Sequence, residues 1–383
     1  MEFKKIRVPF KVKEPVLALG AHVKNTVCFV EDNAAFLSSP QGNLDNLKDF
    51  LGFERAVKYF LKKSPAVISY DLHPEYQSSK YAVALSDHYP LLAVQHHHAH
   101  IVSCMAENNL RNEKVIGVAF DGTGLGLDNR LWGAEFLICD YGKFIRKAYL
   151  KEIPLLGQEM AIREPWRLAA CWLYQIYKER FLNLQISLVK KIDRRKWQVL
   201  RKMYLGGINS SLASSMGRLF DAASSLILGK LRADFEAELA VELEKTGVRC
   251  QVPACQAGRS CVSYNFKIAK NKNGYILDPR PIFKQIVDDL KAKEPREKIA
   301  YRFHLTIAEM IKKTCIILRK DTKINKVALS GGVFQNNLLL SLVLDLLYKE
   351  DFVILQHKQL PNNDASLSFG QAVTAAFRTK LLV

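Results

Sequence analysis

The segments VIGVAFD (115–121), LWGAEFLICD (131–140) and FIRKAYL (144–150) decide the fold, because they begin a strand order that the chain has already used once. The earlier three strands are VLALGA (16–21) and, after it, TVCFVE and AAFLSS, which are short apolar runs close together. Short apolar runs separated by polar or turn residues are typical of a strand meander. The repeated meander therefore predicts two related units.

The first unit continues with helical spacing over 43–63, the strand AVISYD (66–71), a helix over 76–85 and the strand LLAVQ (91–95). Its order is therefore βββαβαβ, which predicts a mixed sheet with helices on its faces. The second unit resumes only at KVALSGG (326–332) and continues at FVILQ, with a helix expected after each.

The interruption of the second unit is a mostly helical insertion of about 157–318, beginning with a long helix from about Ile162. We therefore predict an α/β fold with an N-terminal lead (1–13), lobe I (14–112) and lobe II (113–383), the insertion belonging to lobe II. Two joined lobes predict a cleft, and clefts between domains are common ligand sites.

The composition favours a folded globular protein with an acidic partner. Of the 383 residues, 49% are hydrophobic and 25% are charged, and the formal net charge is +18. Such a charge favours a nucleotide, a nucleic acid or a protein with a negative face. The basic stretch 190–202 is interpreted as a solvated helix face rather than as a helix that binds a phosphate backbone. No apolar run reaches the ~18 residues of a membrane span, and the N-terminus does not resemble a signal peptide, so we expect a cytoplasmic protein.

The eight cysteines are too sparse and irregular for a disulfide scaffold. Cys250, Cys255 and Cys261 cluster, but without a CxxC pair or a nearby fourth ligand. Structural zinc sites almost always have four ligands, so incidental thiols in a loop are the favoured interpretation.

A metal site is predicted from VQHHHAHIV (94–102), where a strand ends and a helix begins. His96 and His100 are four residues apart and therefore share one face of a helix. The alternative is a surface or capping cluster of histidines. Asp121 ends an apolar strand and Asp364 lies in a polar loop before a helix, so all four side chains are expected at strand ends that face the cleft. Two imidazoles and two carboxylates suit iron, zinc or manganese.

Two glycine-containing segments are predicted to bind phosphate. ALSGGVFQNN (328–337) carries Ser330, Gly331 and Gly332 between a strand and a helix, and DGTG (121–124) repeats the arrangement. Backbone N–H groups at such a turn and helix start can bind an anion. The alternative is a pair of ordinary tight turns at strand ends.

Two further polar segments have either a capping or a binding interpretation. IREPWR (162–167) contains Arg163 and Arg167, which suit a phosphate or a carbonyl oxygen. SSMGRLFDAAS (214–224) contains Asp221, which, like Glu236, suits ribose hydroxyls. No internal nucleophile has the surroundings of a catalytic one, so the attacking group is expected to come from outside.

Nine ordered motifs carry a resemblance to a known family. They are DLHPEY (71–76), VQHHHAHIVSCMAE (94–107), VIGVAFDGTGLG (115–126), WGAEF (132–136), IREPWR, SSMGRLFDAAS, RFHLTIA (302–308), SGGVFQNN (330–337) and PNNDASLSFGQA (361–372). From about Val16 onwards the chain resembles the C-terminal half of the HypF family, the hydrogenase maturation carbamoyltransferases. That family is similar to the acetate and sugar kinases, heat-shock proteins and actin, which implies two ribonuclease H-like lobes.

The resemblance implies transfer of a carbamoyl group from carbamoyl-adenylate to the C-terminal cysteine of a HypE-like protein, for the cyanide ligand of nickel–iron hydrogenase. It implies that His96, His100, Asp121 and Asp364 hold one divalent ion, with iron or zinc expected. Catalytic roles are expected for Arg163, Arg167 and His304. The residues expected around the AMP moiety are Gly122, Thr123, Gly124, Ser215, Gly217, Arg218, Asp221, Glu236, Ser330, Gly331, Gly332 and Asn336.

The sequence departs from the family pattern in three ways. The acylphosphatase, zinc-finger and adenylate-forming domains of full-length members do not precede this region, so the adenylate is expected from missing N-terminal domains or from a separate protein. GQEM (157–160) replaces a glycine pair followed by Asp, and FEAELA (235–240) replaces YEGQAA, which bears on the nucleotide contacts of Glu236.

Three rival functions remain from the sequence. One is a tRNA threonylcarbamoyltransferase subunit, which IREPWR and SSMGRLFDAAS argue against, so a nucleic-acid partner is not expected. A membrane partner is not expected either, because no apolar run is long enough for a span. The second is an O-carbamoyltransferase with a different acceptor. The third is a catalytically silent module that binds HypE or a nucleotide, which the altered FEAELA segment favours.

Overall fold

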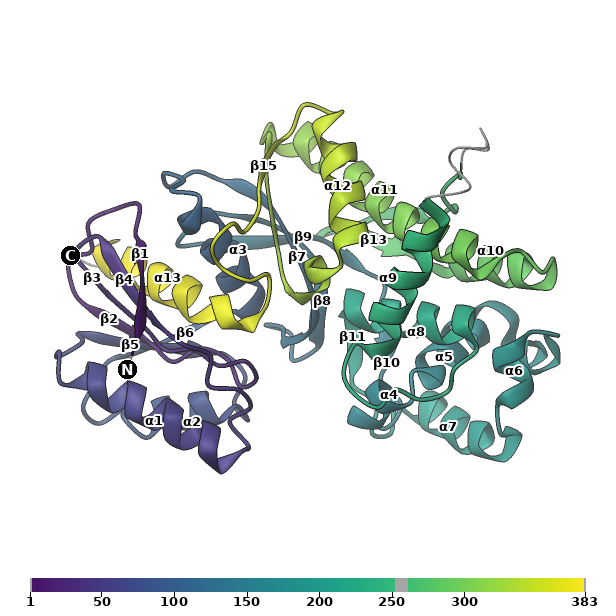
Figure 1. The fold of residues 1–383 in the computed structure, drawn as a ribbon, viewed down its shortest axis with the longest axis horizontal. Helices are drawn as coiled ribbons and strands as arrows, with labels where there is room; N and C mark the ends of the chain where they lie inside the picture. The colour runs from purple at the N-terminus through teal and green to yellow at the C-terminus, as the bar shows by residue number, and fades with distance from the viewer. Residues whose placement is uncertain (1, 252–260, 382–383) are drawn as a thin grey trace.

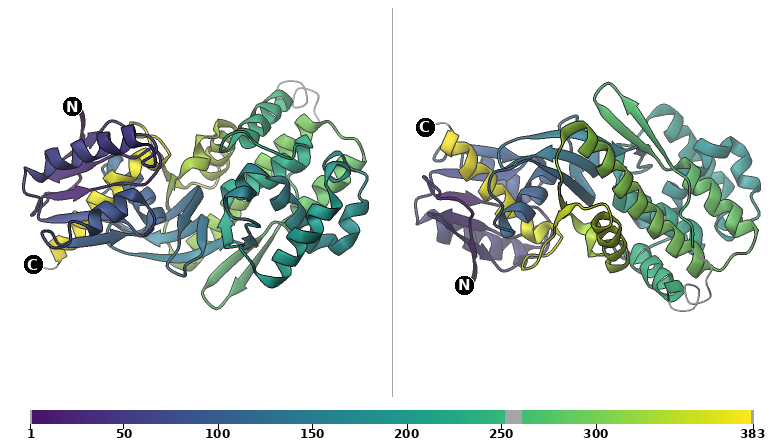
Figure 2. Two further views of the ribbon diagram at one scale, coloured as in Figure 1. Left: turned by 90° about the horizontal axis from the view of Figure 1, so that it is seen from below. Right: turned by 90° about the horizontal axis from the view of Figure 1, so that it is seen from above.

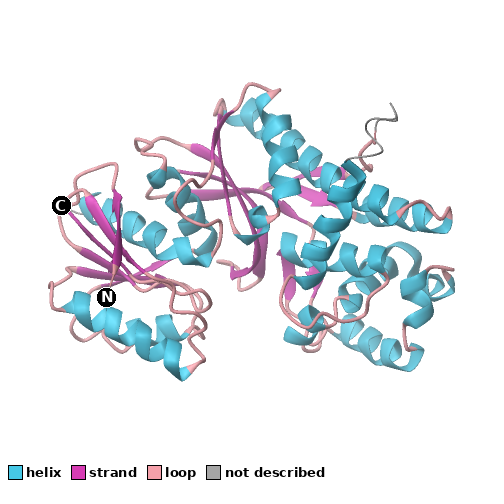
Figure 3. Ribbon diagram, in the orientation of Figure 1, coloured by secondary structure: helices cyan, strands magenta, loops and turns pink. Residues whose placement is uncertain are grey.

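The structure, a computed structural model, describes residues 2–251 and 261–381. Its fold is mixed α/β with two sheets, and a largely helical region extends from the second sheet (Figures 1 and 3). Among the described residues, every helix is too short or too polar to cross a lipid bilayer.

The first sheet has the strand order β1-β4-β3-β2-β5-β6. Its strands are β1 (Phe3–Arg7), β2 (Val16–Ala18), β3 (Cys28–Glu31), β4 (Ala34–Ser38), β5 (Val67–Asp71) and β6 (Leu91–Val94). Strands β2, β3 and β4 pair antiparallel, whereas β5 pairs parallel with β2 and β6. The helices are α1 (Leu47–Leu61), α2 (Gln77–Val83) and α3 (His96–Glu107). The predicted order βββαβαβ is therefore confirmed.

The segment predicted as an N-terminal lead contains strand β1. This strand pairs antiparallel with β4, from Phe3 opposite Ser38 to Arg7 opposite Ala34, and forms the edge of the first sheet. Its single apolar residues include Ile6, which is buried, among exposed lysines. This one-sided pattern is typical of an edge strand with one face on the core.

The second sheet repeats the same arrangement. Its central order is β9-β8-β7-β14-β15, with β7 (Val115–Leu125), β8 (Leu131–Cys139), β9 (Phe144–Leu150), β14 (Lys326–Ser330) and β15 (Val353–Leu355). Strands β7, β8 and β9 pair antiparallel, and β14 pairs parallel with β7 and β15. The segments β4-β3-β2-β5-β6 of the first sheet and β9-β8-β7-β14-β15 of the second thus share one arrangement, three antiparallel strands followed by two parallel ones, and the predicted pair of ribonuclease H-like lobes is confirmed.

The insertion contains strands as well as helices. Its helical part comprises α4 (Glu159–Arg163), α5 (Trp166–Tyr177), η1 (Lys178–Asn183), α6 (Ser187–Lys191), α7 (Arg194–Gly206), α8 (Met216–Leu228), α9 (Glu238–Gln251), α10 (Arg280–Lys291) and α11 (Arg296–Thr322). Short strands β10 (Ile153–Pro154) and β11 (Leu212–Ser215) pair with each other, and β11 also pairs with β8. The hairpin β12 (Lys267–Asn271) and β13 (Gly274–Asp278) extends the sheet beyond β9.

The long helix expected from Ile162 is broken. Helix α4 ends at Arg163 and α5 starts at Trp166, after Pro165. The residue before a proline disfavours the helical conformation, and Glu164 adopts φ −122° and ψ 71°. The proline in IREPWR therefore separates the two helices.

The last helix of each repeat packs against the sheet of the other repeat. The chain closes with η2 (Gly332–Gln335), α12 (Asn337–Tyr348), η3 (Asp364–Ser366) and α13 (Leu367–Leu381). Helix α3 contacts β7, β8 and β14, whereas α13 contacts β2, β3 and β5, and the two helices contact each other between the sheets (Figure 1). The predicted division into 14–112 and 113–383 follows the sequence repeat. The packing does not follow this division, because α3 lies against the second sheet and α13 against the first.

The two helices approach closely because Gly370 has no side chain. A Cβ atom at this position would lie 1.9 Å from the carbonyl oxygen of Ala99. Strand β1 and helix α13 lie at one end of the molecule, and the insertion helices lie at the other (Figure 2).

Candidate functional site

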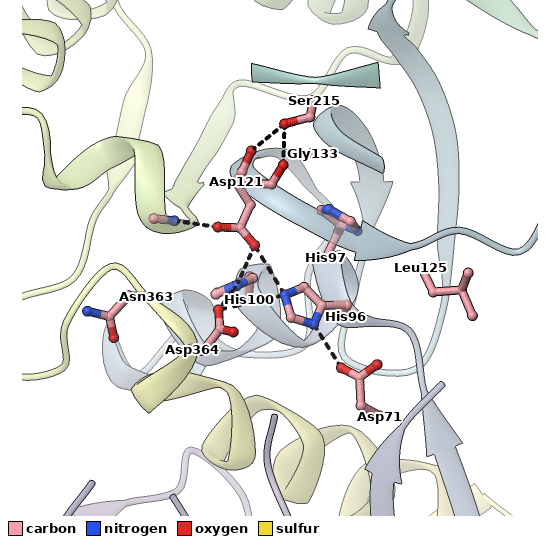
Figure 4. A network of polar contacts seen from close by, with 12 residues as sticks. Asp71, His96, His97, His100, Asp121, Leu125, Gly133, Ser215, Asn363 and Asp364 are labelled. Carbon is pink, nitrogen blue, oxygen red and sulfur yellow. Dashed lines mark hydrogen bonds and ion pairs between the residues drawn. The ribbon is translucent and has the colours of Figure 1, made fainter. Parts of the chain in front are cut away.

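Four side chains from three separate segments meet between the lobes. His96 and His100 lie on the first turns of α3, Asp121 lies in β7, and Asp364 begins η3. One ligand atom from each lies within 4.8 Å of the others (Figure 4). The predicted metal site requires these four side chains to lie close together, and the structure brings them together.

The distances show how the ring nitrogens face the carboxylates. His96 Nε2 lies 3.2 Å from Asp121 Oδ2 and 3.7 Å from Asp364 Oδ1. His100 Nε2 lies 3.7 and 3.4 Å from the same two oxygens. Both imidazoles are fully buried, and His100 Nε2 has no hydrogen-bond partner among the described residues.

Asp71 is a functional residue that the site prediction missed. It ends β5 inside the DLHPEY motif, and its Oδ2 lies 2.8 Å from His96 Nδ1 (Figure 4). A carboxylate that accepts from the far nitrogen of a histidine directs the other nitrogen towards a metal ion. The available sequence signal was that Asp71 ends a predicted strand. Its contact with His96 depends on the tertiary structure.

The buried charges shift the pKa values of His96 and Asp121 in opposite directions. Burial lowers the pKa of His96, but the nearby carboxylates of Asp71, Asp121 and Asp364 outweigh it, so that this pKa lies well above its ordinary value. Burial raises the pKa of Asp121, yet His100 and His96 outweigh it and hold this pKa well below its usual range. Concentrated opposite charge of this kind is typical of a functional site.

The donor set fits a divalent metal ion. Two imidazoles, which lose their protons when a metal ion binds, and two carboxylates are suitable ligands for iron or zinc. The buried His100 Nε2, which faces both carboxylates without a hydrogen bond among the described residues, and the orientation of His96 by Asp71 suit such an ion.

A cavity of about 510 Å³ adjoins the cluster and has Asp121 and Asp364 in its wall. This volume is in the range of small-molecule sites. The predicted nucleotide-site residues that line it are Gly122, Thr123, Gly217, Arg218, Asp221, Glu236, Gly332 and Asn336. The wall residues that the site prediction missed are Val23, Lys24, Tyr76, Phe220, Phe235, Ala237, Ala240, Val241, Glu244, Val333, Gln335 and Asn363.

Four of the predicted nucleotide-site residues lie behind the wall. Ser215 caps α8 and donates to the carbonyl oxygens of Asp121 and Gly122 (Figure 4). Gly124 lies against the rings of His96 and His97. Ser330 Oγ is 2.9 Å from His357 Nε2, and Gly331 has φ +104°.

The two glycine segments differ from the predicted turns. Asp121–Thr123 belongs to β7, in an irregularity of the β7–β8 pairing between Phe120 and Gly124, and the turn follows at Gly126, whose N–H donates to Arg130. The strand continues because Gly124 and Leu125 still pair with β8. In the other segment, the Gly332 N–H donates to Asp121 Oδ1 at 3.1 Å, so this amide already positions a predicted metal ligand.

A buried ion pair lines the far side of the cavity. Arg218 Nε lies 3.0 Å from Asp221 Oδ2, and Arg218 Nη2 lies 3.5 Å from Glu236 Oε1. Burial raises the pKa of Asp221 to about 6, against the effect of Arg218 and with that of Glu236.

None of the three residues expected to be catalytic is part of the cavity wall. Arg163 is exposed and pairs with Glu159. Arg167 is buried, where Glu164 and the Leu156 carbonyl satisfy its guanidinium. His304 is fully buried, and its Nε2 lies 3.0 Å from Asn336 Nδ2, so it contacts a wall residue from behind. Direct contact with a ligand in this cavity is therefore not supported for these three residues.

Neither Cys250 nor Cys261 lines the cavity. Cys250 is buried and Cys261 is partly buried, whereas Cys255 lies outside the described residues. The basic stretch 190–202 forms parts of α6 and α7, which lie in the insertion (Figure 1).

Comparison with known proteins agrees with this fold. Residues 11–107 match the family described as the HypF Kae1-like domain, and residues 117–371 match the second subdomain of the carbamoyltransferase Kae1-like domain. The molecule is thus a two-lobed protein of the Kae1-like carbamoyltransferase class. The chain belongs to the HypF family.

Individual relatives support the assignment. The chain is 34% identical over 382 residues to carbamoyltransferase HypF of Synechocystis sp., covering 96% of this chain and 48% of that protein. It is 31% identical to a carbamoyltransferase HypF homolog of Cupriavidus necator, covering 94% of this chain and 91% of that protein. The chain therefore spans about half the length of the Synechocystis relative and most of the Cupriavidus homolog.

A solved structure of full-length HypF in the phosphate- and nucleotide-bound form matches with a TM-score of 0.89 and 37% identity. The match covers 98% of this chain and 57% of that one. HypF of T. kodakarensis matches with a TM-score of 0.86 and 28% identity, covering 98% of this chain and 49% of that one.

Proposed function

We propose that this chain transfers a carbamoyl group from carbamoyl-adenylate to the C-terminal cysteine of a HypE-like acceptor protein. The observation that carries the proposal is the position of the two-histidine, two-aspartate cluster beside a cavity lined by both lobes, with its two aspartates in the cavity wall. Membership of the HypF family and the likeness to a nucleotide-bound HypF support the adenylate as the ligand.

The proposed nucleotide position follows from the chemistry of the wall. Phe220, Phe235 and Val241 offer apolar surface for the base. Asp221 and Glu236, both paired with Arg218, offer carboxylate oxygens to the ribose hydroxyls. The phosphate would then lie towards Gly122 and Thr123, beside Asp121.

His96, His100, Asp121 and Asp364 would hold an iron or zinc ion, which as a Lewis acid would neutralise charge on the phosphate or polarise the carbonyl. Asp71 holds the His96 ring in place, and the Gly332 N–H holds the Asp121 carboxylate. These hydrogen bonds preorganise the site before the ligand binds.

The transfer step needs a nucleophile from the acceptor. The cysteine loses its proton to solvent, and its thiolate sulfur attacks the carbamoyl carbon. A C–S bond forms, the C–O bond to the phosphate breaks, and AMP leaves with the electron pair. The net charge of +18, which belongs to the whole chain, favours the approach of an acceptor protein with a negative face.

The source of the adenylate is also part of the proposal. Since the Synechocystis relative is about twice as long as this chain, we propose that adenylate formation belongs to other domains or to a separate protein.

The decisive experiment supplies the purified, metal-loaded chain with synthetic carbamoyl-adenylate and a HypE acceptor, without ATP. Mass spectrometry of the acceptor's C-terminal peptide is expected to show one added carbamoyl group. The control is an acceptor with its terminal cysteine replaced by serine. Binding of AMP without any modification of the peptide would contradict the transferase proposal and favour a binding module.

A further inference from the structure

The end of helix α3 carries a buried carboxylate that the proposed transfer does not use. Glu107 is the last residue of α3, and its Oε2 lies 2.6 Å from His357 Nδ1, with both side chains only 1% exposed. Its Oε1 accepts from the backbone N–H groups of Lys358 and Leu360 at 2.8 and 3.2 Å, and from that of Gln359. All these donors belong to the loop that follows β15, and together they compensate the buried charge.

The proton positions in this contact follow from the charges. Burial raises the pKa of Glu107, but hydrogen bonds from His357 and the loop amides outweigh it, so that this pKa lies below its ordinary value. Burial lowers the pKa of His357, and Glu107 opposes this change only in part, so the imidazole is neutral at neutral pH. A neutral imidazole has a single N–H, which donates here from Nδ1 to the carboxylate. Nε2 therefore accepts from the Ser330 hydroxyl, at 2.9 Å.

This serine, histidine and glutamate do not act as a catalytic triad on a ligand in the cavity. Ser330 is fully buried, and none of Glu107, Ser330 and His357 lines the cavity. A nucleophile must contact the group that it attacks. The three side chains therefore serve to hold parts of the molecule together.

Glu107 and Ser330 belong to segments that carry or support the two-histidine, two-aspartate cluster. Glu107 ends α3, whose first turns carry both histidines of the cluster. Ser330 ends β14, and the Gly332 N–H shortly after it donates to Asp121 Oδ1 at 3.1 Å. Because His357 contacts both Glu107 and Ser330, it connects the end of α3 with the segment that holds Asp121.

The loop that surrounds Glu107 leads directly to the remaining aspartate of the cluster, Asp364. The side chain of Asn108, next to Glu107, donates to the Gln356 carbonyl at 2.9 Å, so the first residue of the loop is also fixed to the end of α3. Residues 361–363 alone lie between the anchored amides and Asp364, and they begin with a proline, which restricts the backbone. Anchoring the loop therefore limits the positions that Asp364 can take.

We infer that Glu107 is a positioning residue for the metal site, because its carboxylate anchors the loop 356–360 and so places Asp364 opposite the two histidines. The inference rests on the proposed function and adds to its metal site a residue that acts through the chain rather than by contact with the ion. Since the hydrogen bonds of Glu107 join parts of the chain only, the loop is anchored whether or not an ion is bound. Such preorganisation strengthens ion binding, because the ligand loses less freedom when the ion arrives.

The test measures the affinity of the purified chain for Zn²⁺ by competition with a chelator. Glu107→Ala removes the anchor and is expected to lose about 10- to 100-fold in affinity, as for other residues that orient a metal ligand. Glu107→Gln keeps an acceptor oxygen for the loop amides, and its amide group can donate to His357 if the imidazole donates to Ser330 instead. The glutamine variant is therefore expected to retain most of the affinity.

A second measurement follows the loop itself in the metal-free chain. Hydrogen exchange of the peptide that contains residues 358–360, read by mass spectrometry, is expected to be faster in Glu107→Ala, because these N–H groups lose their acceptor. A general loss of stability would speed exchange throughout the molecule, and not in this loop alone. Glu107→Asp, which keeps the charge on a shorter side chain, is the milder variant if the alanine protein does not fold, and its Zn²⁺ affinity should also fall.

Asp289→Ala is the matched control. Asp289 is a partly buried carboxylate that accepts from Arg302 and from the Tyr264 hydroxyl, both at 2.6 Å, but it lies in α10 of the insertion and does not line the cavity. This variant is expected to lose stability and to keep the Zn²⁺ affinity of the unsubstituted chain.

Unchanged Zn²⁺ affinity in a folded Glu107→Ala or Glu107→Asp protein would overturn the inference and leave the proposed function standing. An equal loss of affinity in Asp289→Ala would also overturn it, because lower stability alone would then explain the effect. If the unsubstituted chain did not bind Zn²⁺, the metal site of the proposed function would itself fail.

Discussion

At the residue scale, the site depends on pairs of histidine and aspartate side chains that orient each other and shift each other's pKa values. His96 lies between Asp71 and Asp121, at 2.8 and 3.2 Å, with no exposure to solvent. Asp71 orients the ring through Nδ1, and Asp121 lies beside Nε2, where a metal ion would bind. The same four ligand types on a flexible surface would bind an ion far more weakly, because each would lose conformational freedom on binding.

The first prediction distinguishes the residue that orients His96 from a residue that would bind the metal ion directly. Asp71→Asn removes the charge behind His96 but leaves all four ligand atoms, so metal affinity is expected to fall by about 10- to 100-fold. His100→Ala removes a ligand and is expected to abolish stoichiometric binding. Metal content after dialysis against a graded series of chelator concentrations measures both. Full metal retention by His100→Ala would show that the ligand assignment is wrong.

The second prediction concerns the pH dependence of stability. Burial raises the pKa of Asp221 from 3.8 to about 6, so the folded state favours its protonated form. The stabilisation from this residue is present below pH 3.8 and is lost as pH rises through 6. Across that window the free energy of unfolding should fall by about 3 kcal/mol more in the unsubstituted chain than in Asp221→Asn. Urea denaturation at several pH values measures the difference, and parallel pH curves for the two proteins would contradict the pKa shift.

At the element scale, single glycines decide how closely strands and turns approach. Gly331 follows β14 with φ +104°, and a Cβ atom there would lie 2.2 Å from the carbonyl oxygen of Phe120 in β7. The adjacent Gly332 N–H donates to Asp121. The main structural role of the glycine pair is therefore to let the end of β14 lie against β7, the strand that carries the predicted metal ligand Asp121.

The third prediction tests this close approach. Gly331→Ala should destabilise the protein by about 3 kcal/mol or more, because it adds a backbone clash to an unfavourable φ. Gly207→Ala is the matched control: Gly207 has φ +64° at the end of α7, but its added Cβ would meet nothing within 4 Å. It should cost only about 1 kcal/mol, from φ alone. Equal losses in chemical denaturation would show that the contact with Phe120 is unimportant.

At the scale of the whole molecule, the exchange of the final helices connects the lobes. Helix α3 carries both histidines and lies on the second sheet, while α13, just after Asp364, lies on the first. The two helices touch where Gly370 meets Ala99. The relative position of the lobes and the geometry of the two-histidine, two-aspartate cluster therefore depend on the same contact.

The fourth prediction follows from this shared contact. Gly370→Leu should move α13 away from α3, and so Asp364 away from His96 and His100. Both the unfolding free energy, by about 3 kcal/mol, and metal affinity should fall. Gly206→Leu places the same side chain on α7, where the added Cβ first meets the Ile208 side chain, and should leave metal affinity unchanged. Normal metal affinity in a folded Gly370→Leu protein would contradict the link.

The repeated order of strands and helices and the residue types of the two-histidine, two-aspartate cluster could be predicted from the sequence alone. Alternating and helical apolar spacing is a local property, so the meanders at 16–39 and 115–150 were visible without coordinates. The i, i+4 histidines at 96 and 100 were visible for the same reason, because one helix turn places them on one face.

Only the tertiary structure decided which residues line the cavity. Lys24, Phe235 and Glu244 come from segments far apart in the chain, and nothing in their local pattern marks them. It also showed that Asp71 supports His96, that DGTG lies within a strand, and that Arg167 and His304 are satisfied behind the wall. These facts depend on long-range packing and hydrogen bonding, which local sequence spacing does not encode.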